Sequence, residues 1–137
     1  MAERGAAAIA EEVTMQSPVD ASSAITGYHA HVYYDAATRA EAAALREAIG
    51  ARFKTVLGRW HDNPVGPHPI SMYQVAFPVD EFPFLVPWLM LNRGELVILV
   101  HPLTGDDYED HAHHALWLGA KLPLKLETLV KGGTAIA

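Results

Sequence analysis

The 137-residue chain contains no cysteine. This absence excludes disulfide bonds, thiolate nucleophiles, and cysteine-ligated zinc or iron–sulfur sites. Any metal ion held by the side chains is therefore bound through nitrogen and oxygen, a donor set that suits Zn²⁺, Fe²⁺, Mn²⁺ or Cu²⁺. The sequence also lacks a membrane-spanning apolar run and a glycine-rich phosphate-binding loop. Its first residues do not show the charged and apolar pattern of a secretory leader, so we expect none. We expect a cytoplasmic protein with no membrane partner and no nucleotide cofactor.

Basic residues are scarce. Ten Lys and Arg residues against 16 Asp and Glu residues give a formal net charge of −6, which argues against a nucleic-acid partner and favours small molecules. Half of the residues are hydrophobic, enough to build a core, and the length fits one domain. Residues 1–26 hold one arginine and four acidic residues, a net charge of −3. We predict that 1–26 form a weakly structured acidic tail and that 27–137 form the single domain.

The hydrophobic pattern predicts four strands and two helices. One helix should begin with a capping box formed by Thr38 and Glu41, and the other should cover 81–92 and end at Gly94. Residues 111–118 are compatible with either a short helix or a strand. Alternating or continuous apolar residues predict strands over 28–34, 54–61, 70–77 and 95–101.

The order strand–helix–strand–strand–helix–strand is typical of the ferredoxin-like fold. We therefore predict an α+β protein with an antiparallel sheet in the order 4-1-3-2 and both helices on one face. The other face then needs a cover, which a second subunit, the C-terminal segment, or both could supply. A homodimer is our default expectation.

Histidine is abundant, with eight residues in the chain. His29 and His31 lie two positions apart in the first predicted strand, so both side chains point to one face, with Cα atoms about 6.6 Å apart. The predicted topology brings His101, near the end of the fourth strand, close to His29. Three imidazoles that converge in this way can bind a metal ion. The simpler interpretation is that alternating histidines mark a half-exposed strand.

His68 lies between two prolines in the loop at 63–69, which presents it rigidly and suits a general acid or base. A solvent-facing turn residue is the simpler alternative, and the predicted topology puts this loop at the far end of the first strand from His101. The polar run at 106–114 could supply a carboxylate ligand, a hydrogen-bond acceptor for a histidine, or only a solvated turn.

Candidate substrate contacts are suggested by residue type alone, without a motif. Tyr33 and Tyr73 could line a pocket for a planar substrate, although aromatic residues more often belong to the core. Arg93 could pair with a substrate carboxylate, against the commoner surface role of arginine.

Five spaced motifs, taken together, resemble the DOPA 4,5-dioxygenase family of fungi and bacteria, over about residues 27–128. They are YHAHVYY from residue 28, HDNPVGPHP from 61, NRGEL from 92, LVHPLTG from 99 and DH from 110. The resemblance implies a ferredoxin-like fold and a non-haem Fe(II) extradiol dioxygenase, which opens the ring of a catechol such as DOPA with both atoms of O₂.

The resemblance also suggests roles for particular residues. With it in view we assign His29, His31 and His101 to the metal and His68 to proton transfer, and we keep Tyr33, Tyr73 and Arg93 as the substrate contacts that their residue types suggest. Fe(II) is the expected cofactor, and Zn²⁺ can take its place in a purified sample. Two alternatives remain: a non-catalytic small-molecule or metal-binding module on a dimeric ferredoxin-like fold, and a cofactor-free monooxygenase on a dimeric α/β barrel.

Overall fold

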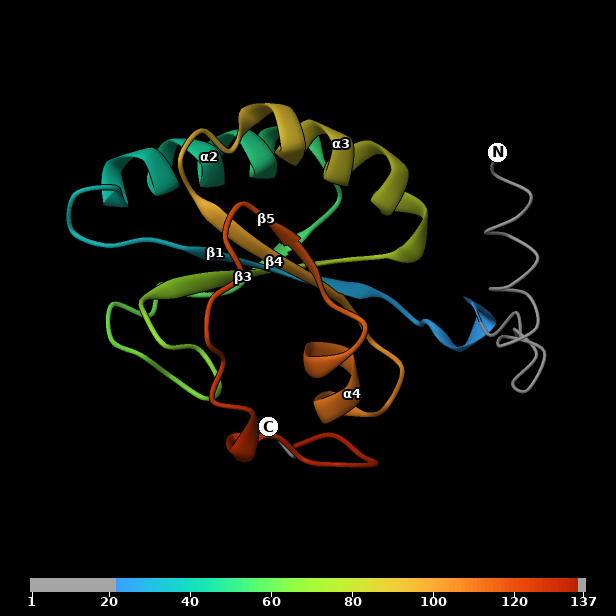
Figure 1. Cartoon of the computed structure of the whole chain (residues 1–137). Helices are drawn as coiled ribbons and strands as arrows, with labels where there is room; N and C mark the ends of the chain where they lie inside the picture. The colour runs from blue at the N-terminus through green and yellow to red at the C-terminus, as the bar shows by residue number, and fades with distance from the viewer. Residues whose placement is uncertain (1–21, 136–137) are drawn as a thin grey trace, which may run out of the picture.

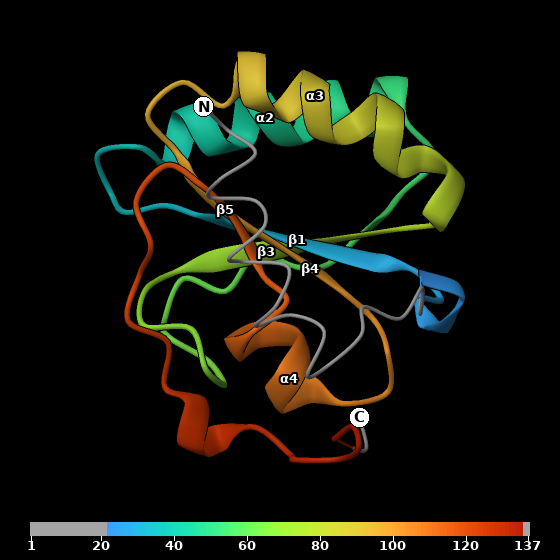
Figure 2. The same cartoon turned by 45° about the vertical axis from the view of Figure 1, so that its right-hand side comes forward.

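The computed structural model describes residues 22–135, so most of the predicted acidic tail lies outside the described residues. A five-stranded antiparallel sheet separates two layers (Figure 1). The long helices α2 and α3 cover one face, and α4 with the C-terminal segment covers the other (Figure 2). The elements are η1 Ser22–Ala24, β1 Tyr28–Tyr33, α2 Arg39–Arg52, β2 Val56–Leu57, β3 Met72–Phe77, η2 Val79–Glu81, α3 Phe82–Asn92, β4 Val97–Pro102, α4 Asp107–Ala112, β5 Leu116–Leu118 and η3 Leu126–Thr128.

The strand order is β2-β3-β1-β4-β5, so the predicted α+β class and the predicted order 4-1-3-2 are confirmed. The fifth strand, β5, pairs with β4 at the edge. The predicted placement of both long helices on one face is confirmed for α2 and α3, and a third, short helix, α4, lies on the opposite face. Of the covers that we considered for this face, the C-terminal part of the chain therefore supplies at least one part.

The main core lies between the sheet and the two long helices. Helix α2 buries Ala42, Leu45 and Ile49 against the sheet, following the three-to-four-residue spacing of an amphipathic helix. On β1, Ala30 and Val32 point to this side and are fully buried. Because side chains alternate along a strand, the intervening residues of β1 point to the other layer. This alternation places the histidines of β1 under α4.

The capping box predicted at the start of α2 does not form. Thr38 is the N-cap residue, but its side chain makes no cap hydrogen bond to the helix. Instead, the Asp35 backbone N–H donates to Thr38 Oγ1 at 3.0 Å, and the Thr38 N–H donates to Asp35 Oδ1 at 2.9 Å. The Thr38 hydroxyl is therefore hydrogen-bonded within the turn before the helix and does not cap the helix. The predicted end of α3 at Gly94 is confirmed, since Gly94 follows the helix with a left-handed φ of 58°.

The predicted strand at 54–61 is much shorter in the structure. Only Val56–Leu57 pair with β3 as a strand, and His61 forms an isolated bridge to Met72. No helix between residues 22 and 135 is long and apolar enough to cross a membrane.

Candidate metal centre

The three histidines predicted to converge lie together on the face of the sheet opposite α2 and α3. His29 in β1 is the direct register partner of His101 in β4, and His31 lies two residues further along β1. One ring nitrogen from each lies within 4.8 Å of the others, which makes the three a group that could hold a metal ion. The Nε2 atoms of His31 and His101 are 3.1 Å apart. Two nitrogens that bind one ion at about 2.1 Å and a right angle would be about 3.0 Å apart.

A second group of three consists of His31, His68 and His111, whose ligand nitrogens also lie within 4.8 Å of one another. All three side chains are buried. The ring centroids of His31 and His68 are 4.2 Å apart, and those of His101 and His111 are 4.0 Å apart. Five imidazoles therefore form one continuous cluster, in which His31 belongs to both groups.

The position of His68 corrects two sequence-based expectations. The loop was expected to remain at the far end of β1, but it folds back so that His68 lies over His31. The solvent-facing alternative is also wrong, because His68 is only 4% exposed. Its Nδ1 atom is 2.7 Å from the hydroxyl of Tyr33. Since a tyrosine hydroxyl both donates and accepts, this contact serves either neutral tautomer of His68.

Contacts at the base of the loop explain why it folds over the sheet. His61 and Met72 exchange backbone hydrogen bonds at its two ends, at 2.9 and 3.1 Å. The carboxylate of Asp62 accepts a hydrogen bond from the Tyr34 hydroxyl at 2.7 Å and another from Arg39 Nε at 2.9 Å. The loop is thereby attached to β1, β3 and the first turn of α2.

The tip of the loop is shaped by a tight turn. Gly66 has a left-handed φ of 56°, and the His68 N–H donates to the carbonyl of Val65 at 3.0 Å. The carbonyl of Pro67 accepts a hydrogen bond from the Lys125 N–H at 2.8 Å, which ties the loop to the C-terminal segment. The prolines restrict the backbone further, so that His68 is held at a defined position.

His111 was left unassigned by the sequence, apart from its place in the last resembling motif. It lies in α4, where its Nδ1–H donates to the Asp107 carbonyl at 2.7 Å in the neutral tautomer that leaves Nε2 free. The helix begins at Asp106, whose side chain accepts from the Glu109 N–H at 3.1 Å. An aspartate at the N-cap position is a sequence signal for the start of a helix. No local sequence pattern, however, indicates that this helix packs against the sheet.

Helix α4 is attached to β4 through Asp110, which is 1% exposed. Its carboxylate accepts hydrogen bonds from the Thr104 N–H and the Thr104 hydroxyl. The polar run is therefore a helix with two buried members, and the prediction of a merely solvated turn is wrong. Asp110 acts here as an anchor for α4 and is absent from both candidate metal groups.

Hydrogen bonds select which nitrogen of each ring faces the cluster. His101 Nδ1 lies 2.9 Å from the carbonyl of Pro102, which can only accept, so Nδ1 carries the proton and Nε2 has a free lone pair. The same reasoning gives His111 a free Nε2. The Nδ1 atom of His31 is buried and has no hydrogen-bond partner among residues 22–135. The potential metal ligands in both groups are therefore imidazole nitrogens, and neither group includes a carboxylate.

Burial keeps the imidazoles of His31, His68 and His101 neutral. Loss of solvation is the main cause and the nearby His111 a smaller one, and together with the other neighbouring groups they lower the pKa of His68 and of His101 to about 3. Burial and then His68 hold the pKa of His31 well below its ordinary value. Neutral imidazole is the form that binds metals, so these rings are ready at neutral pH without first losing a proton. An all-nitrogen set of this kind fits a borderline divalent ion such as Fe²⁺ or Zn²⁺.

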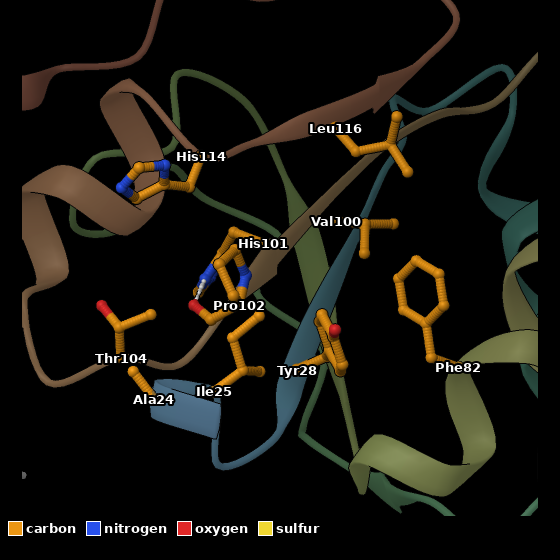
Figure 3. A pocket seen from close by; sticks show the side chains of 10 residues that line it. All are labelled: Ala24, Ile25, Tyr28, Phe82, Val100, His101, Pro102, Thr104, His114 and Leu116. Atoms are coloured by element: carbon orange, nitrogen blue, oxygen red, sulfur yellow. Dashed lines mark hydrogen bonds between the residues drawn. The ribbon is translucent and has the colours of Figure 1, made fainter. Parts of the chain in front are cut away.

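A cavity of about 610 Å³ lies beside the end of β4, and His101 is one of the residues that line it (Figure 3). Tyr28 and Phe82 present aromatic rings to it, and Leu116 contributes a further apolar wall. Thr104 and His114 add polar groups on the α4 side. A concave, mostly apolar site with a few polar groups is the usual form of a small-molecule pocket.

The predicted substrate contacts are dispersed. Tyr33 lies at the cluster, but it is buried and its hydroxyl contacts His68. Tyr73 is fully buried in the core on the helix side of the sheet, where its hydroxyl donates to the Ala42 carbonyl at 2.7 Å. Arg93 follows α3, near the end of β4 away from His101, and donates to the Leu96 carbonyl at 2.9 Å. The structure brings neither Tyr73 nor Arg93 to the histidines.

Comparison with known proteins gives a consistent result. Residues 28–128 match the model of the Dopa 4,5-dioxygenase family. The DOPA 4,5-dioxygenase of Amanita muscaria is 36% identical over 127 residues, which cover 86% of this chain and 55% of that protein. An uncharacterized 21.2 kDa protein of Botryotinia fuckeliana is 37% identical over 127 residues, covering 83% of this chain and 68% of that protein.

One solved structure is similar to this chain, and the similarity covers nearly the whole of the solved chain. The crystal structure of a candidate dioxygenase from Nostoc punctiforme superposes with a TM-score of 0.79 at 58% identity, covering 80% of this chain and 96% of that one. By contrast, this chain spans only about half the length of the Amanita enzyme.

Proposed function

The chain belongs to the Dopa 4,5-dioxygenase family, and from that premise we propose that it is a non-haem Fe(II) extradiol dioxygenase that opens the ring of a catechol such as DOPA with O₂. The observation that carries the proposal is the buried cluster of histidines, one of which, His101, also lines a mostly apolar cavity. A catechol needs two coordination positions and O₂ a third, so the protein should supply about three ligands. A three-histidine group meets that requirement.

His29, His31 and His101 are the proposed ligands, within a single domain that spans 27–137. When bound, Fe(II) would supply the open positions at which catechol and O₂ meet, and Zn²⁺ can occupy the same nitrogens in a purified sample. Of the three, His29 is the least buried, which leaves this side of the group accessible to substrate. The Pro102 carbonyl holds the His101 ring in the orientation that directs Nε2 to the group.

His68 is the proposed proton-transfer residue. The Tyr33 hydroxyl engages its Nδ1, so Nε2 is the atom that exchanges a proton with a catechol hydroxyl or with the opening ring. Because the hydroxyl of Tyr33 can donate to Nδ1 or accept from it, both neutral tautomers of His68 keep a partner as the proton moves. Tyr33 is therefore proposed as a positioning residue in place of the substrate contact expected from the sequence.

The cavity beside His101 is the proposed substrate pocket. Its aromatic residues Tyr28 and Phe82 can stack against a planar ring, and their side chains stand on the helix side of the sheet edge. Thr104 and His114 can hydrogen-bond to polar groups on the substrate side chain. This pocket takes the role that we had assigned to Tyr73 and Arg93.

We also propose a homodimer, which would form through the outer side of α3 and not through the sheet face opposite the long helices. Helix α3 exposes large apolar side chains on its outer side, with Phe84 66% and Leu91 86% exposed. No residue from Phe82 to Asn92 carries a charge, so two copies could pack this helix together without charge repulsion. Light scattering after size exclusion should give twice the chain mass, and Leu91→Glu should give the monomer.

Activity is tested on protein loaded anaerobically with Fe(II) and then exposed to O₂ with DOPA, caffeate or protocatechuate. We expect O₂ uptake with a yellow ring-opened product. His31→Ala should lose both the O₂ uptake and the product, because it removes a proposed ligand. His113→Ala should keep both, because His113 is exposed and outside both groups. Absence of turnover with all three catechols would overturn the proposal, and tightly held zinc without turnover would support the non-catalytic module.

A further inference from the structure

The second group of histidines has no role as a metal site in the proposed reaction. We propose that His31, His68 and His111 form an alternative position for a divalent cation such as Zn²⁺, and that a single cation occupies either this position or the one at His29, His31 and His101. For brevity we call these the enclosed position and the open position. The inference goes beyond the proposed function, because it concerns where the cation lies and holds whether or not the chain oxidises catechols.

Each ring of the enclosed position has one nitrogen engaged and one free. Nδ1 of His68 is engaged by Tyr33, and Nδ1 of His111 by the carbonyl of Asp107, which leaves Nε2 on both rings. On His31 the assignment is reversed, because Nε2 is 3.1 Å from His101 and Nδ1 has no partner. The residue is 3% exposed, so bulk solvent does not reach this nitrogen. A buried nitrogen without a partner, on a ring that forms a possible metal-binding group with two other imidazoles, is a feature that a cation would satisfy.

Hydrogen bonding is complete when the cation is in the enclosed position. His31 then binds through Nδ1 and donates its Nε2–H to Nε2 of His101. His101 in turn donates its Nδ1–H to the carbonyl of Pro102. His68 carries its proton on Nδ1, with the Tyr33 oxygen as acceptor. No ring nitrogen of His31, His68 or His101 is left without a partner.

The two positions exclude each other because they share His31. A neutral imidazole has one free lone pair, on Nε2 for the open position or on Nδ1 for the enclosed one. Filling the open position makes Nδ1 a proton donor, which then cannot bind a second cation. The chain should therefore hold one equivalent of cation that can lie in two places.

Exposure separates the roles of the two positions. His31, His68 and His111 are 3%, 4% and 8% exposed, whereas His29 of the open position is only partly buried. A fully enclosed three-nitrogen position suits Zn²⁺, which accepts tetrahedral geometry with water as the fourth ligand. If the proposed function is correct, a cation there is inactive, since it lies away from His29 and occupies the Nε2 of His68 needed for proton transfer.

The test measures binding of Zn²⁺ to the chelator-stripped protein by competition with a chromophoric chelator. His29→Ala removes only the open position. His111→Asn removes only the enclosed one, because the asparagine amide can still donate to the Asp107 carbonyl in place of Nδ1–H. His113→Ala is the matched control, because His113 lies two residues after His111, is exposed and belongs to neither group. Circular dichroism verifies that each variant is folded, and His68→Asn replaces His111→Asn if that variant is not.

We expect one equivalent of Zn²⁺ in the wild type, in the control and in each single variant, and loss of binding only in the double variant. The absorption spectra of Co²⁺ in the two single variants should differ, because the ligand sets differ. Loss of binding in either single variant would overturn the proposal by showing one fixed ligand set, and two equivalents in the wild type would refute mutual exclusion. These counts do not depend on turnover, so a failure here is distinguishable from failure of the catechol assay.

Discussion

Acid should destabilise the metal-free protein steeply, because two of the clustered histidines, His68 and His101, resist protonation while the chain is folded. His68 and His101 are almost fully buried, and loss of solvation, with a smaller effect of His111, lowers the pKa of each to about 3. In the unfolded chain both rings titrate near the ordinary value of 6.5. Between pH 6.5 and 3 the unfolded state therefore binds more protons than the folded state, so stability falls as the pH falls.

The magnitude follows from proton linkage. Once the unfolded ring is protonated, each neutral buried histidine contributes a slope of about 1.4 kcal/mol per pH unit. His68 and His101 together should therefore remove about 3 kcal/mol between about pH 5.5 and pH 4.5. That loss is a large fraction of the 5–15 kcal/mol by which domains are typically stable. The contribution of the two rings is fully present above pH 6.5 and is lost progressively below it.

The assay is urea unfolding of chelator-treated protein, followed by tryptophan fluorescence at several pH values. His101→Asn keeps a donor for the Pro102 carbonyl but does not titrate, so its slope below pH 6 should be shallower by about 1.4 kcal/mol per pH unit. The exposed His113 provides the control, since His113→Ala should leave the slope unchanged. An unfolding free energy that is flat between about pH 5.5 and pH 4.5, or a wild-type slope in His101→Asn, would refute the reasoning.

Three further changes probe the framework around the cluster. Tyr33→Phe removes the hydrogen bond between the Tyr33 hydroxyl and His68 Nδ1 and should cost about 1–3 kcal/mol in the free energy of urea unfolding, because both groups are buried. Thr104→Val removes the hydroxyl donor to the buried Asp110 and should cost a similar amount, with chymotrypsin cleaving the chain around α4 sooner than in wild type. Ile49→Ala opens a cavity between α2 and the sheet and should cost about 2–5 kcal/mol, with no change in the number of cations bound.

The difference between the two candidate groups shows where inference from sequence succeeds. His29 and His31 share a face because strand side chains alternate, and the order of strands and helices places β4 beside β1. Both rules are local or topological, so the convergence of these residues with His101 followed from the chain alone. Tyr73 illustrates the limit of composition. An aromatic residue suits a pocket or a core equally, and pairing with Val32 puts it on the helix side.

The sequence by itself determined the α+β class, the order of four strands and the exclusion of thiolate ligands from any metal site, since these depend on periodicity and on which side chains exist. Only the tertiary structure decided that His68 and His111 join the cluster. Their positions depend on contacts between residues distant in the chain, such as Tyr34 with Asp62 and Lys125 with Pro67. Loops and short helices are placed by such long-range contacts, which no local pattern encodes. For the same reason the second group of histidines emerged only from the folded chain.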